Sequence, residues 1–222
     1  MLLAIDTAAP VANLALGLGE RLVAERSAAV DTSRSEALLP TLDAMFTSAG
    51  VTPGLLTGVV VGGGPGSYTG IRIAAAAAKG LTQALGLPLY AHGSLEAMSA
   101  GADIGGRPVC SVIPARRGEV FMACHLRRAD GLSIVHADAL IGVAEVAGLA
   151  GAYDAVVVGP VAAAYAAALR DAGVEVDQAL GEHRARGLLD LHRWRGDAGL
   201  VADPLGWEPV YLRPAVDGEH AS

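Results

Sequence analysis

The sequence predicts an α/β protein of two tandem subdomains, each a mixed sheet with helices on its faces. Short apolar strands are interleaved with helical stretches in both halves of the chain, which is the pattern of α/β folds. A glycine-bearing break with little apolar content, residues 101–106, separates the halves. We therefore expect one subdomain at 1–103, a smaller one at 107–213 and a flexible tail at 214–222.

The first half begins with three strands in a meander, because short turns separate apolar runs at 2–7, 11–18 and 21–28. A helix then runs from a cap at Ser33 or Ser35 to Gly50, and its apolar residues recur every three or four positions. The elements expected next are a strand at 57–61, a helix at 69–85, a strand at 87–90 and a short helix at 94–100. This order, βββαβαβα, is that of an RNase H-like domain.

The second half partly mirrors the first. Its expected elements are strands at 108–113, 119–126, 132–135 and 155–159, and helices at 142–149, 160–170 and 186–198. Two RNase H-like halves in tandem describe the actin/Hsp70 type of architecture.

Composition excludes several classes of protein. The net charge of −7 argues against a protein that grips nucleic acid alone through a basic surface. Cys110 and Cys124 have neither metal nor redox spacing, so we expect two small buried thiols in a reducing compartment. No signal peptide and no apolar run of about 20 residues is present, so we expect a cytoplasmic protein without a membrane partner.

A glycine-rich turn, residues 62–70, leads into the helix at 69–85. Such a turn at a helix N-terminus can hold a phosphate. However, the sequence lacks the Lys-Ser/Thr of a P-loop, and its glycines miss the dinucleotide spacing by one residue. We favour a structural turn, capped by Ser67 or Thr69, and keep the phosphate cradle as the alternative.

The helix at 69–85 is apolar or small nearly all round, whereas a surface helix normally has a polar face. One side can face the sheet, and Ala74, Ala77, Gly80 and Ala84 form a second, flat side. The pattern leaves two alternatives open, a fully buried core helix or a helix whose second side is covered by a partner.

These motifs resemble those of the TsaB (YeaZ) family. The strongest match is GPGSYTGIR at 64–72 with AKGL at 78–81. Supporting matches are AIDT at 4–7, SE at 35–36, LLP at 38–40, ARRGEV at 115–120 and PVYLR at 209–213. The chain departs from the family at Arg34, where His is frequent, and at Pro114, where Asp is frequent.

The resemblance implies a non-catalytic scaffold with no cofactor of its own. A TsaB subunit binds TsaD, which transfers the threonylcarbamoyl group to N6 of the adenosine beside the anticodon of tRNA, and the ATPase TsaE joins them. An adenine nucleotide at the interface is compatible with this assembly, and a homodimer could form when TsaD is absent. The residues implied at the interface are Ser35, Leu38, Leu39, Leu42, Met45, Thr69, Arg72, Ile73, Ala76, Ala77 and Gly80.

Two rival functions remain. An actin-like ATPase or phosphotransferase needs an acid and glycines at its phosphate hairpins, but the first hairpin would be Asp6-Thr7-Ala8-Ala9, without glycine. A glycopeptidase-like protease needs a nucleophile constellation or a metal site, and the six histidines are scattered. We therefore predict no catalytic residue and no metal ligand.

Two groups of arginines could contact a nucleotide or RNA. Arg116 and Arg117 lie in a turn beside a glycine, although we favour a structural role for them. The basic end of the chain carries four more, which we interpret as a solvated helix face with tRNA contact as the minor alternative: Arg184, Arg186, Arg193 and Arg195.

Overall fold

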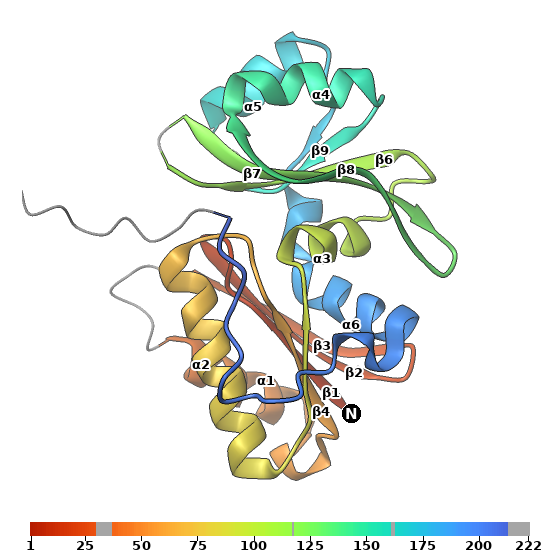
Figure 1. The fold of residues 1–222 in the computed structure, drawn as a ribbon. Coiled ribbons are helices and arrows are strands. Elements are labelled where there is room, and N and C mark those ends of the chain that lie inside the picture. Colours follow the sequence, from red (N-terminus) through yellow and green to blue (C-terminus); the bar gives the residue numbers. More distant parts are fainter. Residues whose placement is uncertain (30–36, 117, 161–162, 213–222) are drawn as a thin grey trace, which may run out of the picture.

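Two five-stranded mixed sheets form the framework of the chain in a computed structural model, which describes residues 1–29, 37–116, 118–160 and 163–212. Figure 1 shows the sheets stacked one above the other, with helices above, between and below them. This architecture confirms the predicted class, two α/β halves in tandem.

The first sheet has the strand order β3-β2-β1-β4-β5. Its strands are β1 (Leu2–Asp6), β2 (Val11–Leu18), β3 (Arg21–Ala29), β4 (Gly58–Gly62) and β5 (Leu89–His92). The predicted meander is confirmed, since β1 pairs antiparallel with β2 and β2 with β3, while β1 pairs parallel with β4. Strands β1 and β4 are buried on both faces, which explains their continuous apolar runs.

Helices cover both faces of this sheet. On one face lie α1 (Leu38–Ala49), the short 3-10 turn η2 (Pro53–Leu55) and α2 (Tyr68–Leu85), which enclose an apolar core around Leu3, Ile5 and Val61. On the other face lies α6 (Arg184–Arg195), and α3 (Ser94–Gly101) lies between α6 and the second sheet (Figure 1). The start of the first predicted helix, with Ser33 and Ser35, lies outside the described residues.

The second sheet has the order β10-β9-β6-β7-β8. Its strands are β6 (Pro108–Pro114), β7 (Glu119–Arg128), β8 (Gly131–Gly142), β9 (Val156–Val158) and β10 (Val176–Asp177). The remaining elements are η3 (Val143–Glu145), α4 (Val146–Ala152), α5 (Ala163–Asp171), η4 (Ala179–Glu182) and η5 (Gly196–Gly199). The helix expected at 142–149 starts later, because β8 continues as an edge strand paired with β7 as far as Gly142.

The last quarter of the chain returns to the first sheet. Leu188 and Leu191 of α6 pack against Ala4, Ala15 and Val60 of that sheet. Beyond α6 the chain runs alongside α2 (Figure 1), and the backbone N–H of Val210 donates to Gly63 O at 2.8 Å. The expected span of 107–213 for the second subdomain therefore assigns α6 and the residues after it to the wrong sheet. The break at 101–106 marks where the chain leaves the first sheet, but no local pattern marks its return.

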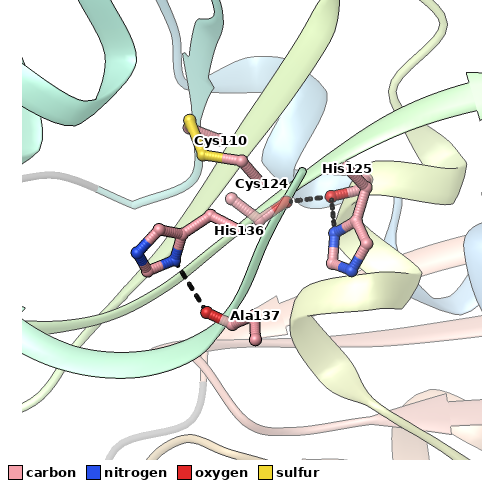
Figure 2. The surroundings of a disulfide bond; sticks show 7 residues. Cys110, Cys124, His125, His136 and Ala137 are labelled. Carbon is pink, nitrogen blue, oxygen red and sulfur yellow. Dashed lines mark hydrogen bonds between the residues drawn. A yellow bond between two sulfur atoms is a disulfide. The ribbon is translucent and has the colours of Figure 1, made fainter. Parts of the chain in front are cut away.

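The two cysteines form a disulfide rather than the expected pair of thiols. The reason is the register of the β6–β7 hairpin, which places Cys110 directly opposite Cys124 with their Cα atoms 4.1 Å apart. Figure 2 shows the bond across the two strands, with the His136 ring of β8 nearby. The cysteines consequently give no argument for a reducing compartment.

None of the helices in the described part of the chain combines the length and the apolarity that a membrane crossing requires.

Candidate functional site

The glycine-rich turn packs against the end of β1. Gly64 has a positive φ of 93°, and the Gly64–Pro65 peptide bond is cis. A Cβ on Gly66 would lie 2.4 Å from Ala8 O, and a Cβ on Gly70 would lie 2.0 Å from Thr7 O. Glycine is thus required here because backbone approaches backbone.

Backbone N–H groups of the turn are already used within the chain. Gly63 N donates to His92 O at 2.8 Å, and Ser67 N donates to Ala8 O at 2.7 Å. Gly64 N donates to Ser94 Oγ, and Gly70 N donates to Ser67 Oγ, which makes Ser67 the cap of α2. A phosphate cradle needs such groups free to donate to a ligand, so these contacts favour the structural turn.

Asp6 is neutralised by an arginine of its own chain. This is the residue that the ATPase alternative would need as the acid of its first phosphate hairpin. The Arg184 Nε atom donates to Asp6 Oδ1 at 2.7 Å, and both side chains are almost fully buried. The rest of the guanidinium donates to the carbonyl oxygens of Gly181 and Val11. Asp6 is therefore held in a buried ion pair.

The outward side of α2 carries small residues in its second half and larger ones near its start. Thr69, Arg72, Ala76 and Gly80 are exposed, while Ile73 and Ala77 are half-buried. Because these positions recur every three or four residues, they form one continuous side of the helix. All six belong to the interface predicted from the sequence.

The α1 part of the predicted interface is different. Leu38, Leu42 and Met45 are buried in the first core, and Met45 has no exposed surface. Only Leu39, at 60% exposure, presents a large apolar side chain to solvent. Leu38, Leu42 and Met45 thus stabilise the fold and are not free to contact a partner, and Ser35 lies outside the described residues.

An aromatic cluster that the sequence analysis did not single out extends the α2 surface. The Tyr68 and Tyr211 rings lie 5.4 Å apart, and the Arg72 guanidinium lies 5.1 Å from the centre of the Tyr68 ring. Tyr68 is half exposed. The sequence could have indicated Tyr68, because this residue lies in the motif at 64–72. It could not have indicated the contact with Tyr211, because the two residues are far apart in the sequence.

The predicted arginine groups are not gathered into one basic face. Arg116 is exposed in its turn, and Arg117 lies outside the described residues. At the basic end, Arg184 is buried with Asp6, and Arg195 binds Glu96 through two hydrogen bonds. The interpretation of the basic end as one solvated helix face is therefore wrong for Arg184.

A serine–histidine contact lies in the interior. The His125 Nδ1 atom is 3.0 Å from Ser99 Oγ, which is 2.8 Å from Ser111 Oγ. Ser99 and Ser111 have no exposed surface and His125 has 2%, so no substrate can reach them. Burial lowers the pKa of His125 below its ordinary value. This network stabilises the packing of α3 on the second sheet and does not favour a protease.

The described residues offer no group of three or more His, Cys, Asp or Glu placed to hold a metal ion.

Comparison with known protein families supports the resemblance that the sequence motifs indicate. Residues 29–181, more than half of the chain, match the family model described as "TsaD: tRNA N6-adenosine threonylcarbamoyltransferase". The chain belongs to this family. It is 32% identical over 120 residues to the tRNA threonylcarbamoyladenosine biosynthesis protein TsaB of Bacillus subtilis and 32% identical over 133 residues to that of Escherichia coli.

These matches cover part of each protein. They span 54% and 59% of this chain, and 52% and 57% of the Bacillus subtilis and Escherichia coli proteins. The chain thus aligns with somewhat more than half of the curated relatives that it matches.

Solved structures extend the likeness to nearly the whole chain. A Pseudomonas aeruginosa protein described as similar to peptidase YeaZ superposes with a TM-score of 0.78 at 27% identity, covering 96% of this chain and 99% of that one. Component A of the (R)-2-hydroxyglutaryl-CoA dehydratase of Acidaminococcus fermentans superposes with a TM-score of 0.56 at 12% identity, covering 87% and 97% of the two chains. The second likeness concerns the fold alone.

Proposed function

We propose that the chain is a non-catalytic scaffold subunit that binds a TsaD-type transferase, and TsaE with it, and that threonylcarbamoyl transfer to N6 of the adenosine beside the tRNA anticodon requires it. The observation that carries the non-catalytic part is the Asp6–Arg184 pair. In an ATPase of this fold that carboxylate would face the metal and phosphates, whereas here a buried guanidinium of the same chain neutralises it.

The observation that supports the scaffold part is the α2 surface. A helix side of small residues lets a second helix approach closely, and Ala76 and Gly80 on that side are exposed, with none of the described residues covering them. Leu39 of α1 and Leu205, which lies beyond α6, add exposed apolar surface of the kind that marks protein interfaces. A homodimer through the same surface remains an alternative when the transferase is absent.

The test is reconstitution of the modification. Threonine, bicarbonate, ATP, unmodified tRNA, the adenylate-forming enzyme, TsaD and TsaE are combined with and without the chain, and the modified nucleoside is counted. We expect product only when both the chain and TsaD are present. Equal product without the chain would contradict the scaffold role.

A variant pair tests the surface itself. Ala76→Glu places a charge on the exposed side of α2, and Ala167→Glu places the same charge on an exposed position of α5. We expect Ala76→Glu to abolish co-purification with TsaD, and Ala167→Glu to leave it unchanged, with both variants folded. Normal co-purification of Ala76→Glu would refute this placement of the interface.

The ATPase alternative has its own measurement, which is ATP hydrolysis by the isolated chain. The buried pair at Asp6 predicts none above background. Hydrolysis that Asp6→Asn abolishes would restore that alternative.

A further inference from the structure

A basic pocket lies where α6 meets the β2–β3 hairpin and the end of β7. Its volume is about 130 Å³. Figure 1 shows these elements converging on the side of the molecule away from α2. The charged residues that line it are Glu20, Arg21, Arg127, Arg186, Asp190 and Arg193.

The charges of the pocket are unbalanced. Asp190 is paired with Arg193 at 3.0 Å and with Arg127 at 3.8 Å, so one carboxylate is shared between two guanidinium groups. Arg21 and Arg186 have neither a hydrogen bond nor an ion pair within the described residues, and both are exposed. Four arginines against two carboxylates leave a local positive excess in a chain whose net charge is −7.

The arrangement holds the pocket in place before any ligand arrives. Arg127 donates to Ala100 O at 2.6 Å and lies 5.4 Å from the centre of the Trp194 ring, so its guanidinium is fixed. Asp190, which is only 5% exposed, positions Arg193 beside it. Arg127 and Arg193 are thus held in place beside the pocket, while Arg21 and Arg186 are exposed at its edge. Such arginines are suited to phosphate, because the planar guanidinium donates two parallel hydrogen bonds to it.

We propose that this pocket binds a phosphate group of an RNA strand. The pocket follows from the geometry alone, and the choice of RNA over a free phosphate rests on the proposed function. An acidic protein can contact RNA through such a site if the positive excess is local, since each phosphate neutralised by an arginine releases condensed counterions. The pocket is on the other side of the first sheet from α2, so RNA and a protein partner could be bound together.

The test compares two double variants with the same change of charge. Arg21→Glu/Arg186→Glu alters the pocket, whereas Arg26→Glu/Arg170→Glu alters two exposed arginines outside it. Binding of fluorescently labelled unmodified tRNA is measured by anisotropy over a range of salt, for the isolated chain and for its complex with TsaD. We expect the pocket variant to bind about tenfold more weakly or worse, with a salt slope reduced by about 1 to 2, and the control variant to bind as the wild type does.

Each outcome decides one question. Equal weakening in both variants, or none in either, would overturn the proposal, since binding would then depend on net charge or on other residues. If inorganic phosphate raises the melting temperature of the wild type but not of the pocket variant, while tRNA binding is unchanged, the pocket is a small-anion site and the assignment to RNA fails. Gel filtration with TsaD is run in parallel, so a failure of the scaffold role would be seen separately from a failure of RNA binding.

Discussion

Arg184 is an arginine with 1% of its surface exposed, in contact with an aspartate that has none. Removing one partner of a buried ion pair leaves the other charge uncompensated, which costs about 3–5 kcal/mol. We therefore expect Arg184→Met to lower the free energy of unfolding by about that amount, measured by urea denaturation.

The control for this prediction removes the negative charge of Asp6 as well. Asp6→Asn in the Arg184→Met background should recover part of the lost free energy of unfolding, because no unpaired charge is then buried. Arg107→Met, which breaks an exposed pair with Glu175, should hardly move the urea midpoint. A double variant no more stable than Arg184→Met alone would show that lost packing, not charge, causes the effect.

His92 makes the stability dependent on pH. Burial, and then the positive charge of Arg195, lower its pKa from 6.5 to about 4, although the nearby Glu96 opposes this. Between these two pH values His92 is protonated in the unfolded chain but not in the folded chain. The free energy of unfolding therefore falls as the pH drops from about 6.5 to about 4. The lost stability from His92 is about 3 kcal/mol, since one pKa unit corresponds to about 1.4 kcal/mol.

Urea denaturation at several pH values checks this dependence. His92→Asn should lose less stability on acidification than the wild type, because its side chain does not titrate. Some slope should remain, since burial also lowers the pKa of His125 and of His192. An unchanged slope in His92→Asn would assign the effect to other groups.

Among the elements, α1 shows most clearly what a helical pattern does and does not determine. Its apolar spacing predicts the helix, but Leu39 and Leu42 both fit an apolar stripe in the sequence. In the structure Leu42 is 5% exposed and Leu39 is 60% exposed, because the helix turns only one side to the sheet. The width of an apolar stripe therefore does not say which residues a core covers and which are left for a partner.

This difference gives a matched pair of variants. Leu42→Ala should lower the free energy of unfolding by about 2–4 kcal/mol, because it leaves a cavity in the first core. Leu39→Ala should change it by no more than about 0.5 kcal/mol, because its side chain is exposed. Thermal or urea unfolding measures both, and similar losses in the two variants would contradict the position of α1.

Elements with strong local signals could be predicted, and contacts between distant residues could not. The meander was predictable because short turns separate its apolar runs, and α2 because a capping residue, Ser67, precedes its apolar stretch. Strand β10 has two residues and gives no periodicity. At the site, the glycine-rich turn was recognisable by composition, whereas Arg184 meets Asp6 across 178 positions, which no local pattern reports.

At the scale of the whole molecule, the position of α6 shows which parts of the chain form the first subdomain. It covers one face of the first sheet and supplies the partner of Asp6, and Arg195 at its end binds Glu96 of α3. The chain that follows continues along the same sheet, where Val201 N donates to Leu89 O at 2.9 Å. The first subdomain is therefore built from both ends of the chain, and a fragment ending at 103 lacks one of its layers.

We accordingly predict that residues 1–103 alone do not fold cooperatively. The exposed face of β1 and β4 and the unpaired Asp6 would each oppose folding. Joining residues 184–212 to this fragment through a flexible glycine–serine linker should restore a cooperative transition, because it returns both the apolar cover and the arginine. Circular dichroism during urea titration and the dispersion of amide NMR signals measure this. A linked fragment carrying Arg184→Met separates the contribution of the ion pair from that of the apolar face. If the 1–103 fragment alone is stable and gives well-dispersed amide signals, α6 serves to hold the two sheets together and is not part of the first core.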